Sequence, residues 1–209
     1  MLKLDGVEVL IFDLGGVIID IDFQLTFDQF AMLSGKSTDE IKNLVLDSGL
    51  LLQYEIGQCS ATQFLNSIRS SLELSCSDDA IEHAFLALLL HIPAQRIALL
   101  RSLAKHYRLF LLSNTNAMHY EEVNAILQRD AGCEHLEQLF ETLFLSFEMG
   151  LAKPGTEIYE AVVKAIGVKP EAILFLDDNE ANLAGASSVG IQTALVSVEQ
   201  SIISLFKYE

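Results

Sequence analysis

The sequence predicts an α/β fold in which a Rossmann-like parallel sheet core carries an inserted helical segment. Three observations predict this fold: short apolar segments that end in polar residues, helical patterns between those segments, and a purely helical stretch early in the chain. Strands that alternate with helices favour right-handed crossovers and parallel pairing. With 209 residues, the chain is long enough for a main domain with a smaller insertion.

The first expected strand runs from Val7 toward Asp13. The four apolar residues before Asp13 include β-branched and aromatic side chains, which is typical of a strand buried on both faces. Asp13 would then stand at the carboxyl end of the strand, the edge where ligands bind in open α/β sheets. Gly15 and Gly16 follow, and their lack of a side chain would let backbone atoms approach a ligand beside Asp13.

Residues 20–92 show only helical patterns. A first helix is expected around Phe23 and Phe27 and closes at Gly35. The next three expected helices begin at serine caps, two of them in capping boxes: Ser37 with Glu40, Ser60 with Gln63, and Ser77. Because no strand pattern interrupts this stretch, residues 20–92 are expected to form a helical domain, and residues 1–19 with 93–209 the sheet domain.

From Pro93 onward, helical and strand patterns alternate. The expected strands lie at 108–112, 142–145, 172–176 and 191–196, and the expected helices at 97–103, 123–127, 158–166 and 182–189. This order is typical of a sheet extended by parallel crossovers.

Composition excludes several classes of protein. A hydrophobic content of 51% excludes a wholly disordered chain. The net charge of −16, from 29 acidic and 13 basic residues, argues against binding to nucleic acid or to an anionic membrane. The three cysteines are widely spaced, so they predict neither a disulfide framework nor a zinc site, and they fit a reducing cytoplasm.

Targeting signals are not evident in the sequence. Charged residues at positions 3, 5 and 8 leave no apolar core for a secretory signal at the start of the chain. The longest apolar run, residues 84–90, is far shorter than the roughly 20 residues that cross a bilayer. We therefore expect a cytoplasmic protein.

Polar clusters follow three of the expected strands. They are Asp13 after the first strand, Ser113, Asn114 and Thr115 after the second, and Asp177 with Asp178 after residue 176. Lys153 and Pro154 are expected to open a helix, where backbone N–H groups and the helix dipole favour anions. If the strands are parallel, these clusters meet at one edge and combine a nucleophilic carboxylate, hydroxyl and amide donors, a lysine and carboxylates for a hard cation.

Each cluster alone has a simpler interpretation. Ser113 and Thr115 fit ordinary turns, Lys153 fits a solvated surface charge, and adjacent aspartates commonly cap helices. Four clusters at successive strand ends are harder to explain as capping. Gathered carboxylates would also repel one another unless a cation relieved them, and Mg²⁺ would do so.

With these motifs in place, the sequence resembles the haloacid dehalogenase superfamily over nearly its whole length. The four matching motifs, in order, are Phe12–Val17, Ser113–Thr115, Lys153–Pro154 and Leu176–Asn179. Residues 20–92 stand where that superfamily inserts its cap domain. The sequence most resembles the small bacterial sugar-phosphatase branch, related to α-D-glucose-1-phosphate phosphatases.

The resemblance implies a role for each motif residue. Asp13 would be the nucleophile and a Mg²⁺ ligand, and the carbonyl of Gly15 would be another ligand. Asp178 would bind Mg²⁺ directly, and Asp177 through water or as a nearby acceptor. Phosphate would be bound by the second motif, Ser113, Asn114 and Thr115. Lys153 would steady the nucleophile and the transferring phosphoryl group.

One position departs from the family pattern. Members of the superfamily usually carry a second aspartate two residues after the nucleophile, where it serves as general acid and base, and this chain has Gly15 there. Such a group contributes about 10²–10⁴-fold to rate. Asp20, Asp22 and His119 are the nearest replacements in sequence, although His119 also fits a surface or cap-facing histidine.

The resemblance implies a Mg²⁺-dependent phosphatase that cleaves a small phosphorylated metabolite, a sugar phosphate first of all, through an aspartyl-phosphate. Two alternatives stay open: a phosphate-sensing or interaction protein that kept the pocket without turnover, and a dehalogenase-type hydrolase, against which the paired Asp177 and Asp178 argue. Cap residues would select the substrate, and the candidates are Phe23, Phe27, Tyr54 and Glu55.

Overall fold

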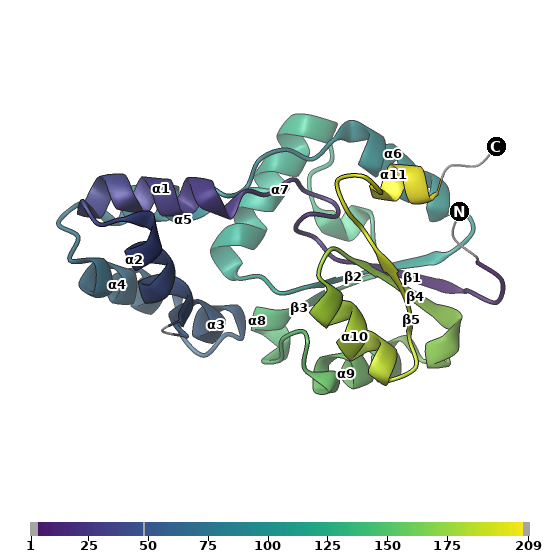
Figure 1. The fold of residues 1–209 in the computed structure, drawn as a ribbon. Helices are drawn as coiled ribbons and strands as arrows, with labels where there is room; N and C mark the ends of the chain where they lie inside the picture. The colour runs from purple at the N-terminus through teal and green to yellow at the C-terminus, as the bar shows by residue number, and fades with distance from the viewer. Residues whose placement is uncertain (1–3, 48, 207–209) are drawn as a thin grey trace.

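The structure is a computed structural model that describes residues 4–47 and 49–206. Its centre is a parallel sheet of order β3-β2-β1-β4-β5, which confirms the predicted α/β fold (Figure 1). The strands are β1 Val9–Phe12, β2 Arg108–Ser113, β3 Thr142–Leu145, β4 Ile173–Asp177 and β5 Gln192–Leu195. β1 lies in the middle, where Phe12 pairs with Leu111 on one side and Leu176 on the other.

Alternate residues of each central strand face opposite layers, as the two-residue period of a strand requires. In β1, Leu10 and Phe12 join one buried cluster, whereas Val9 and Ile11 join the other. This is why the strand is apolar at every position. Both faces of the sheet are therefore covered, as the unbroken apolar run predicted.

Two layers of helices cover the sheet (Figure 1). The first cluster lies under α6 Ala94–Leu103, α7 Ala117–Ala131 and α11 Ile202–Leu205. The second cluster lies under α9 Thr156–Ile166 and α10 Glu180–Ser188. The short helix α8 Ser146–Met149 follows β3, and single 3₁₀ turns occupy Leu136–Gln138 and Pro170–Ala172.

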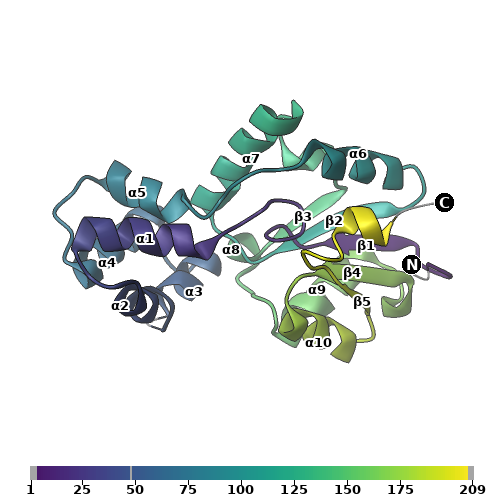
Figure 2. The same ribbon diagram turned by 45° about the horizontal axis from the view of Figure 1, so that its top comes forward.

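Residues 20–92, which we call the helical segment, stand beside the sheet (Figures 1 and 2). The segment contains α1 Phe23–Ser34, α2 Thr38–Lys42, a π-helical turn Asn43–Asp47, α3 Leu50–Glu55, α4 Ala61–Leu72 and α5 Asp78–Leu86. The capping boxes predicted at Ser37 and Ser60 are both present. The segment buries its own apolar cluster, in which Phe64 and Phe85 pack with ring centroids 4.8 Å apart.

The two connections between the helical segment and the sheet run side by side as an antiparallel ribbon. The Asp20 N–H donates to the His91 carbonyl at 2.8 Å, and the Leu90 N–H donates to the Asp20 carbonyl at 3.0 Å. An oxygen of Asp130, at the end of α7, accepts the Ile92 N–H at 2.9 Å. The chain thus enters and leaves the helical segment through a narrow, hydrogen-bonded ribbon.

Two details differ from the sequence-based expectation. The helix after Lys153 begins only at Thr156, with Gly155 as its N-cap, so Lys153 precedes the helix instead of opening it. The short helix α3 was not predicted, because Leu50–Leu52 shows no helical period and its N-cap Gly49 has no side chain. Within the described residues, no helix is long and apolar enough to cross a membrane.

Candidate active site

The carboxyl ends of three neighbouring strands bring the predicted clusters together. Asp13 follows β1, Ser113 ends β2 and Asp177 ends β4. The Asp13 N–H donates to the Leu176 carbonyl at 2.9 Å, which holds the start of the loop against β4. Parallel pairing therefore converges these side chains on one edge, as the sequence predicted.

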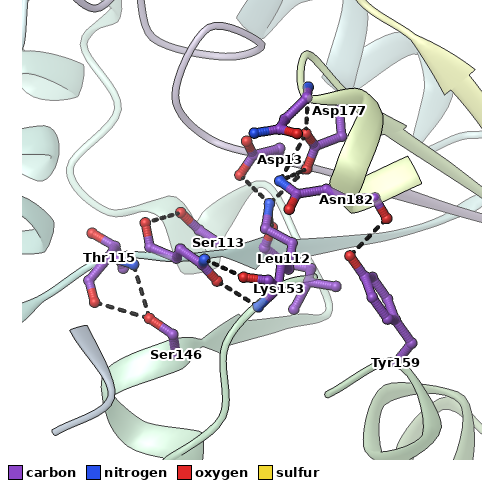
Figure 3. A network of polar contacts seen from close by, with 11 residues as sticks. Asp13, Leu112, Ser113, Thr115, Ser146, Lys153, Tyr159, Asp177 and Asn182 are labelled. Atoms are coloured by element: carbon purple, nitrogen blue, oxygen red, sulfur yellow. Dashed lines mark hydrogen bonds and ion pairs between the residues drawn. The ribbon is translucent and has the colours of Figure 1, made fainter. Parts of the chain in front are cut away.

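Lys153 lies at the centre of this edge (Figure 3). Its ammonium is 2.8 Å from an oxygen of Asp13 and 2.7 Å from an oxygen of Asp177, and it donates to the Leu112 carbonyl at 3.1 Å. Burial alone would lower the pKa of Lys153, but the two carboxylates outweigh burial and raise it. Lys153 is therefore a buried permanent cation, not the solvated surface charge that a lone lysine suggests.

The carboxyl group of Asp13 is also buried. Burial raises its pKa to about 6, the charge of Lys153 opposes the rise, and the charge of Asp177 adds to it. The ion pair with Lys153 thus favours the ionised form that a nucleophile requires. The Oδ1 oxygen makes the contact with Lys153, and a hydrogen bond from the Leu14 backbone also lowers the pKa of this carboxyl group.

Asp177 is fully engaged by protein donors. Besides Lys153, its oxygens accept the Asn179 N–H at 2.8 Å and the Asn182 side-chain amide at 3.1 Å (Figure 3). With these bonds made, Asp177 serves to hold Lys153 in place. This arrangement fits a nearby acceptor better than a direct metal ligand.

Asp178 projects into more open space beside the same cluster. Asp13, Asp177 and Asp178 each offer an oxygen, and these oxygens all lie within 4.8 Å of one another. Partial burial and the charge of Asp177 raise the pKa of Asp178. Three carboxylates against one lysine leave an excess of negative charge on hard oxygen donors, which fits a Mg²⁺ ion.

Gly16 makes room for Asp178. Its φ is +70°, and a β-carbon there would lie 2.2 Å from an oxygen of Asp178. Both the left-handed backbone and the close approach require glycine at this position. Gly15 has neither constraint, since its φ is outside the left-handed region and a β-carbon would meet only the end of the Ile21 side chain at 3.0 Å.

The second motif shapes the loops around the site. The Asn114 side chain accepts the Lys153 N–H and donates to the Lys153 carbonyl, both at 2.9 Å, so it fixes the lysine backbone. The Thr115 N–H donates to the Ser146 hydroxyl, which in turn donates to the Thr115 carbonyl. Ser113 and Thr115 are both buried beneath the site. Asn114 thus has a clear positioning role in addition to the phosphate-binding role that the resemblance implies.

Two hollows open from this edge. A main cavity of about 940 Å³ lies between the sheet edge, with Asp13, Lys153 and Asp178, and the helical segment. A smaller inner chamber of about 80 Å³ adjoins it and has mostly apolar walls. Gly15, Asn114 and Glu55 line both hollows.

Comparison with known proteins agrees with this geometry. The family model of haloacid dehalogenase-like hydrolases matches residues 7–190. The chain belongs to this hydrolase family.

Two curated relatives of this hydrolase are phosphatases. The D-ribitol-5-phosphate phosphatase of Bacteroides thetaiotaomicron is 26% identical over 187 residues, which is 90% of each chain. A phosphatase of Mycobacterium tuberculosis is 24% identical and covers 91% of this chain and 88% of its own length. Among solved structures, a HAD family enzyme of Bacteroides thetaiotaomicron in complex with magnesium and inorganic phosphate matches with a TM-score of 0.87 and 32% identity. The match covers 96% of this chain and 100% of that enzyme.

The two aspartates suggested as replacements for the missing acid, Asp20 and Asp22, lie elsewhere in the hydrolase. Asp20 pairs with Arg96 at 2.8 Å, and Asp22 caps α1 by accepting the Gln24 N–H. Neither aspartate lines the main cavity or the inner chamber. They therefore serve the fold of the connecting ribbon and of α1.

His119 lines the inner chamber but is almost fully enclosed. Its ring stacks on Phe85 with centroids 4.3 Å apart, and burial lowers its pKa to about 4. Its Nε2 has no hydrogen-bond partner in the described part of the chain. A neutral, stacked imidazole fits a packing role between α5 and α7, so the cap-facing interpretation describes it better than proton transfer.

The candidate specificity residues divide between the cavity and the core of the helical segment. Phe23, Phe27 and Glu55 line the main cavity. Tyr54 is instead buried in the helical segment, where it stacks on Phe64 at 4.6 Å. Ser146 and Asn182 were missed by the sequence analysis, because each acts only through a partner that is distant in sequence.

Proposed function

We propose that this hydrolase is a Mg²⁺-dependent phosphatase that cleaves a small phosphorylated metabolite, a sugar or polyol phosphate, through an aspartyl-phosphate on Asp13. The observation that carries the proposal is the Asp13 carboxylate paired with Lys153 at 2.8 Å inside a cluster of acidic oxygens. The magnesium and phosphate of the similar Bacteroides enzyme support the cation and the reaction class. The name of the ribitol-phosphate phosphatase supports the substrate class.

In the proposed reaction, a carboxylate oxygen of Asp13 attacks phosphorus in line with the departing ester oxygen. Lys153 neutralises charge that develops on the phosphoryl oxygens, and the second-motif loop supplies N–H and hydroxyl donors. Water then attacks the aspartyl-phosphate and releases phosphate. A Mg²⁺ held by Asp13, the Gly15 carbonyl and Asp178 would neutralise further phosphoryl charge.

We further propose that residues 20–92 are a cap domain that closes over the main cavity, and residues 1–19 with 93–209 its core. The separate apolar cluster of the helical segment and its narrow hydrogen-bonded attachment support this division. Closure would exclude water from the phosphoryl group before Asp13 attacks. The free, well-separated cysteines support a cytoplasmic location.

Phosphate release from a panel of sugar and polyol phosphates, including D-ribitol-5-phosphate, tests the function. We expect turnover with Mg²⁺, none in EDTA, and none for Asp13→Asn, which keeps the shape of the side chain but not its nucleophilicity. Gly15 favours one alternative, a phosphate sensor without turnover, because it cannot transfer a proton. Tight binding of phosphate without release from any ester would support that alternative and refute the phosphatase.

A further inference from the structure

Cleavage of a phosphate ester leaves an alkoxide oxygen that needs a proton, and Gly15 has no group to give one. The identity of the donor matters only if the function proposed above is correct, and the inference below rests on it. Because Asp20 and Asp22 bind elsewhere and His119 is enclosed, the candidates for the donor are the other acids that line the main cavity. A suitable donor faces the site and has no partner of its own.

Glu55 meets this description. It is the last residue of α3 and lines the main cavity opposite Asp13 and Lys153, and it lines the inner chamber together with Gly15. Its carboxyl group therefore faces the space beside the position where relatives carry their second aspartate. In the described part of the chain, no hydrogen bond or ion pair holds this carboxyl group.

Two contacts between the helical segment and the sheet domain flank Glu55 and fix its place. On one side, the Tyr54 hydroxyl accepts the Met118 N–H of α7 at 3.4 Å. On the other side, Gly57 has a φ of +69°, and a β-carbon there would lie 2.2 Å from the Phe147 carbonyl oxygen. Glycine thus lets the chain after α3 touch α8. The chain therefore contacts the sheet domain at Tyr54, just before Glu55, and at Gly57, two residues after it.

The surroundings of Glu55 suit proton transfer. Burial raises its pKa to about 7, and the positive charge of Lys153 opposes the rise. The other ionisable groups that line the same hollows are Asp13, Lys42, His119, Asp178 and Glu180. A partly buried carboxyl group without a partner gains nothing from its place in the wall, so packing alone gives no reason to keep it.

We propose that Glu55 is the general acid and base of the reaction, in place of the aspartate that Gly15 replaces. In the first step, Asp13 bonds to phosphorus, the ester P–O bond breaks, and the Glu55 proton passes to the departing oxygen, which leaves as an alcohol. In the second step, the Glu55 carboxylate takes a proton from a water molecule while the oxygen of that water bonds to phosphorus. The bond to Asp13 then breaks, and phosphate leaves with Glu55 protonated again.

Two probes of similar shape separate this role from a structural one: p-nitrophenyl phosphate and phenyl phosphate. The nitrophenolate leaves without help, whereas the phenolate, with a pKa of about 10 like that of tyrosine, needs a proton. In single-turnover experiments with Mg²⁺, we expect Glu55→Gln to slow phenol release by about 10²–10⁴-fold. Nitrophenol release should slow far less.

The matched control is Glu73→Gln, the same chemical change at an exposed residue of the helical segment, and it should behave as wild type. For the wild type, kcat/KM for phenyl phosphate should fall above pH 7, where Glu55 loses its proton. The Glu55→Gln variant should lack this alkaline fall. Glu55→Asp keeps a carboxyl group and should therefore be faster than Glu55→Gln with phenyl phosphate. If Glu55→Gln folds poorly, the pH dependence of the Glu55→Asp variant tests the same role.

If Glu55→Gln slowed both probes by the same factor, or slowed neither, the assignment of Glu55 would be overturned. A folded wild type that turns over neither probe nor any ester of the sugar and polyol phosphate panel would instead overturn the proposed function, and this inference with it. The two failures are distinguishable because only the second removes wild-type activity.

Discussion

The ammonium group of Lys153 lies 2.8 Å from an oxygen of Asp13, and both side chains are buried at the carboxyl edge of the sheet. The charge of the lysine favours the ionised carboxylate, which is the state that attack on phosphorus requires. The same pair also ties function to stability. Removing the lysine leaves the buried carboxylates of Asp13 and Asp177 without their shared cation.

Lys153→Met should therefore abolish turnover and destabilise the protein by about 3–5 kcal/mol, since Asp13 and Asp177 would lose their shared cation. Urea unfolding in EDTA measures the change. Lys164→Met on the exposed side of α9 is the control and should shift the midpoint little. A Lys153→Met protein as stable as wild type would contradict the assigned charge balance.

Gly16→Ala should weaken Mg²⁺ binding, because the new β-carbon would lie 2.2 Å from an oxygen of Asp178 and displace it. Gly35→Ala is a matched control. Gly35 has nearly the same φ, +71°, but nothing within 4 Å of its β-carbon position. Both variants carry the same backbone strain, so only Gly16→Ala should lose affinity in a calorimetric Mg²⁺ titration. If Gly16→Ala and Gly35→Ala bound Mg²⁺ with equal affinity, Gly16 would have no role in the metal site.

Asp178→Ala should keep the fold and lose the response to Mg²⁺. Removing one carboxylate relieves repulsion within the acidic cluster, so the melting temperature in EDTA should stay equal to that of wild type or rise. The rise on adding Mg²⁺, which reflects binding to the folded state, should disappear together with turnover. Full activity of this variant in EDTA would refute the metal assignment.

Asp130 should stabilise the attachment of the helical segment in a pH-dependent manner. Its bond with the Arg129 side chain lowers its pKa to about 2, and the Ile92 N–H adds to the effect. Because the folded-state pKa is below the unfolded one, this contribution is complete above about pH 4 and is lost as pH falls toward 2. Asp130→Asn should lower the melting temperature by about 2–4 °C at pH 7, and the difference should vanish near pH 2. A constant difference across that range would contradict the linkage.

The predicted part of the fold rests on local signals. The capping boxes at Ser37 and Ser60 need only residues three positions apart, and both formed. The convergence of Asp13, Lys153 and Asp178 followed from parallel pairing, which the alternation of strands and helices indicates without any distance information. The general location of the site was therefore accessible from the sequence.

The residues that the sequence concealed depend on long-range packing. Asn182 and Ser146 bind Asp177 and Thr115 across different elements, and no spacing in the sequence records those pairs. Glu55 was one of four candidates in the helical segment, and only the folded structure shows that it lines the main cavity whereas Tyr54 is buried. The sequence also grouped Gly15 with Gly16, although only Gly16 is required by geometry.

Gly15→Asp tests whether the glycine is a missing catalytic part. The backbone of Gly15 lies outside the left-handed region, and its new β-carbon would contact only the flexible end of Ile21 at 3.0 Å, so an aspartate can be accommodated with a small shift. We expect the substitution to raise the turnover of the wild type, because it supplies a second carboxylate at the position where the usual family pattern has one.

The sharper experiment places Gly15→Asp in the Glu55→Gln background, where the proposed proton donor is absent. Turnover of phenyl phosphate should recover there, since the new aspartate faces the same hollows as Glu55. Gly15→Asn in that background is the control of equal shape without an exchangeable carboxyl proton, and it should give no recovery. Melting temperatures establish that each variant is folded. If Gly15→Asp turns over phenyl phosphate no faster than Gly15→Asn in this background, a carboxyl group at position 15 cannot reach the leaving oxygen. Glu55 would then not be a substitute for an acid at position 15.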